Sequence, residues 1–257
     1  MEKISIITRA LKSSELKPLF SHLKQEHLHE VIAVCVKPDW VPHPPFRLIV
    51  EQSGRFEAKI TGIKHARGDY VLLLDSDQFP EAGLISELEK SKTDMVIIPE
   101  RSSRSDAIGI MLDDWRSRNE RRAMKNPSPY IPVIPRFYNK DKILKAAEKI
   151  PREVIKTVVS HEDSVLYYEV FKITNSLSFS SKRIFNDDPD LGVILRKAFL
   201  YGKSEAEVKR KKLPDEYLKV ISTVNRSSLN VQELGLGLGY IMQTLKALSY
   251  FISELTE

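Results

Sequence analysis

The sequence has little cysteine: Cys35 is the only one among 257 residues, so an intrachain disulfide is excluded. Cys35 lies in an apolar run, which favours a small buried core residue. The start, Met1-Glu2-Lys3, leads directly into a predicted strand and carries no apolar signal segment. These absences predict a protein of a reducing compartment. We expect a cytoplasmic location, with the cytoplasmic face of the membrane as a peripheral alternative.

A strong excess of one charge is also lacking. Lys and Arg number 40 against 35 Asp and Glu, which gives a net charge of +5 and an isoelectric point of about 9.1. Such a mild excess is compatible with anionic partners such as nucleotides, nucleic acid or a membrane surface, and equally with ordinary surface charge.

Long apolar runs are rare as well. The most apolar segment, residues 234–252, approaches the length of a membrane span, but Gln243, Thr244 and Lys246 interrupt it. This pattern predicts an amphipathic helix instead. The core, a second copy of the chain in a homo-oligomer and the membrane surface are its candidate contacts.

One short apolar run, residues 71–74, ends abruptly in Asp75 and Asp77. Its length and its entry through Gly68-Asp69 predict a strand buried on both faces, with the two carboxylates at its carboxyl end. In open α/β sheets ligands bind at that edge. Two carboxylates so close favour a cation, and Mg²⁺ or Mn²⁺ fits them together with substrate phosphate oxygens. The alternative is an Asx-rich turn without a ligand.

Strands and helices alternate along the chain. We predict strands at residues 4–8, 31–36, 48–50, 71–74 and 94–99, and helices at residues 13–27, 55–65, 81–90, within 101–126 and at 142–149. This order predicts an α/β fold: a Rossmann-like, mostly parallel sheet flanked by helices, followed by a C-terminal helical extension. Thr8 and Arg9, where the first strand ends, become candidate nucleotide contacts.

A second polar cluster is Ser160-His161-Glu162-Asp163-Ser164, which precedes a predicted helix at residues 165–171. Acidic residues stabilise a helix start through capping and the helix dipole, and this structural role is one interpretation. A catalytic carboxylate is the other. His161 is an alternative base or metal ligand.

Residues 51–80 resemble the donor-binding core of family 2 glycosyltransferases of the GT-A fold. The similarity rests on three stretches: Ala58-Lys59-Ile60-Thr61-Gly62-Ile63, Ala66-Arg67-Gly68-Asp69-Tyr70 and Asp75-Ser76-Asp77. Lys59 stands where the family usually has arginine, and Ile60 where it usually has asparagine. The resemblance extends over residues 3–205, which implies a catalytic domain at 1–205 and a helical extension at 206–257.

The resemblance implies transfer of a sugar from a nucleotide-diphosphate sugar to an acceptor hydroxyl, with inversion. Asp75 and Asp77 would bind Mn²⁺ or Mg²⁺, and Asp163 would be the general base. Donor contacts would come from Thr8, Arg9, Asp39, Lys59, Asp75, Ser76 and Asp77. The chain lacks the Gln-x-x-Arg-Trp motif of processive relatives, so we expect a non-processive enzyme. Candidate acceptors are a lipid-linked substrate or another sugar.

Two alternatives are weaker. A sugar nucleotidyltransferase usually has a Gly-rich, Arg-Lys-containing loop after its first strand, whereas this chain has Thr8-Arg9-Ala10-Leu11. In a basic nucleic-acid-binding module, the two acids at the predicted site would repel the phosphate backbone. We therefore expect no nucleic-acid partner.

Overall fold

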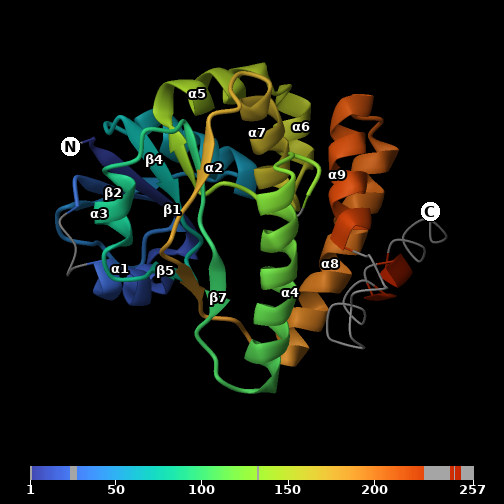
Figure 1. The fold of residues 1–257 in the computed structure, drawn as a ribbon, viewed down its shortest axis with the longest axis horizontal. Coiled ribbons are helices and arrows are strands. Elements are labelled where there is room, and N and C mark those ends of the chain that lie inside the picture. The colour runs from blue at the N-terminus through green and yellow to red at the C-terminus, as the bar shows by residue number, and fades with distance from the viewer. Residues whose placement is uncertain (1, 24–27, 132, 229–243, 246, 250–257) are drawn as a thin grey trace. The chain divides into compact units, whose positions relative to one another are not determined.

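The computed structural model describes residues 2–23, 28–131, 133–228, 244–245 and 247–249 (Figure 1). It divides into two compact units that interleave along the chain. Unit 1 contains residues 1–101, 135–150 and 169–186, and unit 2 contains residues 102–134, 151–168 and 187–257. The predicted domain boundary after residue 205 falls within a helix of unit 2.

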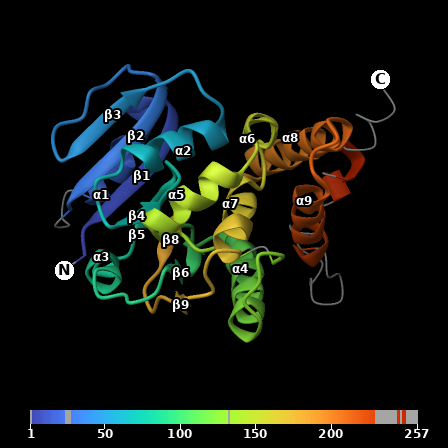
Figure 2. The same ribbon diagram turned by 90° about the horizontal axis from the view of Figure 1, so that it is seen from above.

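The described residues of unit 1 form a seven-stranded sheet in which β8 is antiparallel to β4 and β6, while the other paired strands are parallel (Figure 2). In sheet order the strands are β3 Phe46–Val50, β2 Glu30–Lys37, β1 Ile4–Lys12, β4 Tyr70–Leu73, β8 Phe137–Asn139, β6 Met95–Ile97 and β9 Leu177–Phe179. The predicted α/β fold with a mostly parallel central sheet is confirmed.

Both faces of the sheet are covered. On one face, Ile6 and Leu72 pack in a core with side chains of α1 (Lys17–Leu23) and α3 (Leu84–Leu88). On the other face lies α2 (Arg55–His65), whose bounds match the prediction; there a Cβ on Gly62 would collide with the Ile7 side chain. This burial on two sides explains the continuous apolar runs in the sequence.

A second, three-stranded sheet was not predicted. It has the order β5-β10-β7, with β5 Gln78–Pro80, β10 Ile184–Asn186 and β7 Glu100–Ser102. Pro80 is tolerated because it ends an edge strand, where its missing N–H costs no ladder hydrogen bond. The helix predicted at residues 81–90 is correspondingly shorter, since α3 begins only at Leu84.

Capping residues set the starts of three further helices. At the start of α4 (Ala107–Lys125) the Asp106 side chain accepts a hydrogen bond from the Gly109 amide. At the start of α5 (Lys140–Lys149) the Asn139 side chain accepts one from the Lys142 amide. Asp190 caps α8 (Leu191–Arg210). The remaining helices are α6 Arg152–Thr157, α7 Glu162–Phe171 and α9 Asp215–Ser228.

The predicted helix at residues 13–27 begins as a 3-10 turn, η1 Ser13–Leu16, and continues as α1, while residues 24–27 lie outside the described residues. The amphipathic segment predicted at 234–252 also lies largely outside them. In the described parts of the chain, no helix combines the length and apolar character needed to cross a membrane.

Candidate active site

Asp75 emerges at the carboxyl edge of the sheet. All four residues of β4 are buried, and the Leu74 amide donates to the Ile7 carbonyl at 2.9 Å, so Asp75 follows beside Thr8 and Arg9 of β1, a strand that continues to Lys12. Thr8, two percent exposed, buries its Oγ1 there without a hydrogen-bond partner among the described residues. Because buried polar atoms are rarely left unsatisfied, this hydroxyl suits contact with a polar ligand.

Two arginines hold the Asp75 carboxylate. Arg55 Nη2 lies 3.1 Å from Asp75 Oδ1, and Arg136 Nη1 lies 3.5 Å from Oδ2. Arg136 also donates from Nε to Glu100 Oε1 at 2.8 Å. Burial raises the pKa of Asp75, but the charges of Arg55, Arg136 and Lys59, with the Arg55 hydrogen bond, outweigh it and hold that pKa well below its usual range. Asp75 is therefore ionised at neutral pH.

Helix α2 delivers two of these cations from one face. Arg55 and Lys59 are four residues apart, and Gly62, three further on, lies against β1. The absent side chain at Gly62 lets α2 approach the strand closely. The close approach places the amino-terminal turn of α2 beside the end of β4.

Asp75 and Asp77 differ in their surroundings. The Asp75 amide donates to Gln78 Oε1 at 2.9 Å, and Gln78 Nε2 donates to Asn186 Oδ1 at 2.8 Å. Gln78 is buried, and it anchors the turn after β4, whereas Asp77 is exposed. One carboxylate thus faces the arginines, and the other is accessible to solvent.

The two carboxylates can hold a hard cation only if a bound ligand supplies further oxygen atoms. No group of three or more His, Cys, Asp or Glu side chains in the described ranges is arranged to hold a metal. Each Asp75 oxygen meets one guanidinium in the ion pairs above and keeps a second acceptor site. Mg²⁺ commonly uses one or two carboxylates plus substrate phosphates, so the donor set matches an ion bound together with a diphosphate.

Asp39, predicted as a nucleotide contact, fixes the first turn after β1. Its carboxylate accepts from Ser13 Oγ at 3.1 Å, from the Ser14 amide at 2.9 Å and from Ser14 Oγ at 2.7 Å. The Ser14 hydrogen bonds lower the pKa of Asp39 to about 2. These contacts also explain why the chain starts η1 as a separate turn before α1.

The polar cluster at 160–164 lies in unit 2, where α7 begins at Glu162. His161 adopts the left-handed region with a φ of 66°, and its Nε2 lies 3.2 Å from Glu205 Oε1 on α8. Glu162 is buried, whereas Asp163 is partly exposed. Of the two carboxylates, Asp163 is therefore the one more open to a substrate.

Helix α4 is rich in arginine, a side chain that either recognises phosphate or belongs to a solvated helix face. Arg116 makes a bidentate pair with Asp188, both bonds being 2.7 Å, and Arg118 pairs with Asp114. The Arg116 fork is thus engaged in tying α4 to the segment before α8. This favours a structural role for Arg116.

Three comparisons with known proteins bear on this geometry. Residues 40–145 match the family model described as Glycosyl transferase family 2. This stretch contains Asp75, Asp77, both arginines that pair with Asp75, and Glu100. This part of the chain is therefore similar to family 2 glycosyltransferases. No curated protein matches the chain.

Several solved structures share the fold of this chain at low sequence identity. The mannosyltransferase PcManGT from Pyrobaculum calidifontis, in complex with GDP-Man and Mn²⁺, has a TM-score of 0.59 and 13% identity, covering 100% of this chain and 88% of that one. S. aureus TarS 1-349 has a TM-score of 0.54 and 16% identity, covering 97% of this chain and 80% of that one. The structure of the same protein in complex with UDP-GlcNAc has a TM-score of 0.53 and 12% identity, covering 98% of this chain and 90% of that one. The expected GT-A fold is confirmed.

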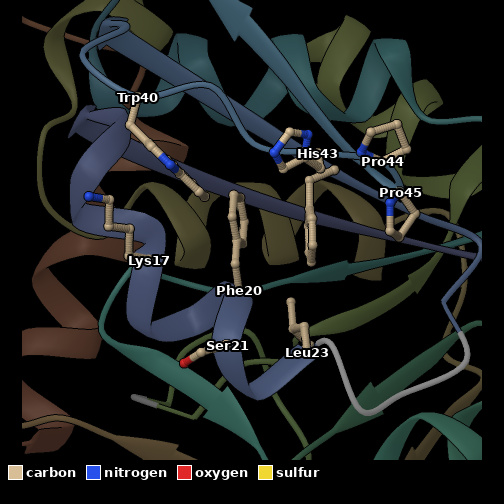
Figure 3. Close-up of a pocket in the computed structure, with 9 residues that line it drawn as sticks. Lys17, Phe20, Ser21, Leu23, Trp40, His43, Pro44 and Pro45 are labelled. Atoms are coloured by element: carbon tan, nitrogen blue, oxygen red, sulfur yellow. The ribbon is translucent and has the colours of Figure 1, made fainter.

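Unit 1 also has a cavity of about 410 Å³ between α1 and the loop at residues 38–45 (Figure 3). Aromatic rings dominate it: Phe20 stacks on Phe46 at 4.2 Å, and Lys17 lies 5.8 Å from the Trp40 ring centre. The predicted site residues are not among the described residues that line it. Its apolar walls give a diphosphate little to bind.

Sequence reasoning missed Arg55, Arg136 and Glu100, which surround Asp75 in unit 1. Arg55 could have been found, because it precedes Lys59 by one helical turn. Arg136 could not, because it reaches Asp75 through the antiparallel pairing of β8 with β4: the Leu73 amide donates to the Arg136 carbonyl at 2.8 Å.

Replacing Arg136 by glutamine should lower the free energy of unfolding by about 3 kcal/mol, because it removes one partner of a largely buried ion pair and leaves Asp75 and Glu100 undercompensated. Urea denaturation measures this. Arg118→Gln is the matched control, since its exposed pair with Asp114 is worth at most about 1 kcal/mol.

The difference in stability between the parent and Arg136→Gln also depends on pH. Asp75 has a folded pKa below its ordinary value of 3.8, so its ionised form stabilises the fold above that pH and loses this effect as the pH falls below it. The difference between parent and Arg136→Gln should therefore narrow in acid. A variant as stable as the parent at neutral pH would show that the network does not hold Asp75.

Proposed function

We propose that this chain transfers a sugar from a nucleotide-diphosphate sugar to an acceptor hydroxyl. The observation that carries the proposal is the position of Asp75 and Asp77 at the carboxyl end of buried β4, within the stretch that matches the glycosyltransferase family. The neighbours crystallised with GDP-Man and with UDP-GlcNAc support a donor of this class.

The donor binds at the carboxyl edge of the sheet. Thr8 offers an unsatisfied hydroxyl, and Arg9, Lys59 and Ser76 line the approach from β1, α2 and the turn after β4. Asp39 keeps η1 in place beside the nucleotide. The Arg55 and Arg136 side chains fix the orientation of the Asp75 carboxylate, which leaves it ready for the donor.

Asp77 and Asp75 would hold a divalent ion, Mn²⁺ or Mg²⁺, with Asp77 offering the oxygens that are accessible to solvent. Such an ion supplies positive charge to the diphosphate as the bond to the sugar breaks. The Mn²⁺ in the PcManGT complex supports this choice of cofactor.

Asp163 accepts the proton of the acceptor hydroxyl, which attacks the anomeric carbon opposite the leaving diphosphate. One displacement inverts the configuration. The amino-terminal end of α7 favours the ionised carboxylate before the transfer. Each encounter transfers one sugar, and the enzyme is non-processive.

We also place the protein in the cytoplasm, with a lipid-linked substrate or another sugar as acceptor. The single cysteine, which allows no intrachain disulfide, supports a reducing compartment.

A thermal-shift comparison tests the proposal. The protein is heated with UDP-sugars, GDP-mannose and other nucleotide sugars, each with and without Mn²⁺. At about 100 times Kd, a donor stabilises the fold by about 2.7 kcal/mol, which corresponds to about 5–10 °C at this chain length. We expect one donor class to give this shift with Mn²⁺ only. Identical melting in every mixture would contradict the proposal.

A further inference from the structure

The first half of α8 carries large apolar side chains on its outside. Leu191 is 39% exposed, Val193 and Phe199 are each 40% exposed, and Leu200 is 53% exposed. The opposite side of the helix is buried through Ile194, Ala198, Gly202 and Ala206. Helix α8 is therefore packed in unit 2 on one side. Val193 and Leu200 lie on the opposite side by helical spacing, whereas Leu191 and Phe199 lie toward the buried side.

Basic residues share this outer side. Val193, Arg196, Lys197, Leu200 and Lys203 follow one another at helical spacing, three or four residues apart, so they form one stripe along the helix. All five are exposed. We call this stripe, with Phe199 beside it, the basic apolar face.

Acidic residues are absent from this part of the sequence. Between residues 191 and 204 the chain has three basic residues and no Asp or Glu. The acids of α8 come later: Glu205 pairs with His161, and Glu207 pairs with Lys211 at 3.6 Å. The stretch of α8 that carries the basic apolar face therefore contributes three positive charges and no acid of its own.

The C-terminal part of the chain adds to this face. Ser249 Oγ donates to the Phe199 carbonyl at 2.6 Å, so the short stretch at 247–249 lies against α8 there. Leu248, the neighbour of Ser249, is 51% exposed. Another apolar side chain is thus close to Phe199 at the surface.

We propose that the basic apolar face of α8 binds the surface of an anionic membrane. Apolar side chains interleaved with cations on one exposed helix side are suited to the boundary between lipid headgroups and acyl chains, where each part of the face finds a partner. The long stems of Arg196 and Lys203 can reach headgroup phosphates while Val193 and Leu200 enter the apolar layer.

Charge argues against the other occupants. In a two-fold contact with a second copy, the same face would oppose itself and bring Arg196, Lys197 and Lys203 against their equivalents. Cores of protein interfaces are also depleted in lysine. Nucleic acid would satisfy the cations but would leave Val193, Phe199 and Leu200 in contact with water or phosphate. This inference does not depend on the proposed sugar transfer.

Vesicle sedimentation with the full chain tests the inference. One set of vesicles is phosphatidylcholine alone, and the other is phosphatidylcholine mixed with phosphatidylglycerol. We expect the parent to sediment with the anionic set, weakly with the neutral set, and less as salt is added. The double variant Val193→Asp with Leu200→Asp should lose at least about tenfold in partitioning, since apolar insertion is replaced by repulsion.

Matched variants separate the face from general charge. Val41→Asp with Val50→Asp adds the same charge at exposed apolar positions of unit 1, and it should bind as the parent does. Arg196→Gln with Lys203→Gln should weaken binding several-fold and flatten the salt dependence. Lys145→Gln with Lys149→Gln, on exposed positions of α5, should change neither.

Each result has one meaning. The variant Val193→Asp with Leu200→Asp could melt differently from the parent. In that case Arg196→Gln with Lys203→Gln, which leaves the apolar side chains in place, decides whether the face binds vesicles. Equal binding of the α8 variants and the parent, or no binding of the parent to anionic vesicles, overturns the proposal. So does a parent that is dimeric by light scattering, binds no vesicles and becomes monomeric in the variant Val193→Asp with Leu200→Asp, because a second copy then covers the face.

Discussion

Replacing Asp163 by asparagine should lower the rate of sugar transfer by at least about 100-fold, with donor affinity and melting close to those of the parent. A general base acts in the transition state, and its loss typically costs about 10²–10⁴-fold in rate. Asparagine keeps the shape of the side chain and its ability to cap a helix, so only the basicity is removed. Transfer rate and donor affinity are measured on the same variant.

Asp190→Asn provides the control for capping. Asp190 caps α8 by accepting from the Val193 amide, as an acid at a helix start with no proposed part in the reaction. Its variant should transfer sugar at the rate of the parent. If Asp163→Asn also stays within a few-fold of the parent, Asp163 serves only the helix start, and Glu162 or His161 becomes the candidate base.

Replacing Asp77 by asparagine should weaken the Mn²⁺-dependent binding of a nucleoside diphosphate by about 100-fold or more, since it removes the accessible ligand of the ion. The fold should remain intact, because Asp77 is exposed at the end of the turn after β4. Calorimetric titration with and without Mn²⁺ measures the effect. Asp141→Asn, an exposed acid in the first turn of α5, should leave the affinity unchanged.

Asp75→Asn should behave differently from Asp77→Asn. It removes the counter-charge of Arg55 and Arg136, so stability should fall together with donor binding. A loss of binding in Asp75→Asn alone, with Asp77→Asn equal to the parent, would assign the site to the arginine network and remove the metal from it.

The parts of the fold that follow local rules could be predicted from sequence. The apolar run before Asp75 gave its position at a strand end, because a strand buried on both faces needs no polar alternation. The bounds of α2 followed from its apolar spacing. The edge strand β5, which ends at Pro80, was by contrast not predicted.

Long-range pairings account for the rest. Arg136 is next to Asp75 because β8 inserts antiparallel between β4 and β6, a register with no local signature. Glu100 joins the same network from β7, and Asn186 from β10. The charges that keep Asp75 ionised thus come from segments far apart in the chain, and a single sequence gives no sign that they meet.

The nucleotide product tests the central claim most directly. The protein is incubated with Mn²⁺, pyrophosphate, the nucleotide sugar that stabilises it and candidate sugar and lipid-linked acceptors, and the products are followed by phosphorus NMR. Cleavage between the sugar and the diphosphate releases a nucleoside diphosphate, which we expect from the parent and not from Asp77→Asn. A nucleoside triphosphate with sugar phosphate would identify a nucleotidyltransferase, and it would contradict the account, as would a donor left intact by the parent in the presence of candidate sugar and lipid-linked acceptors.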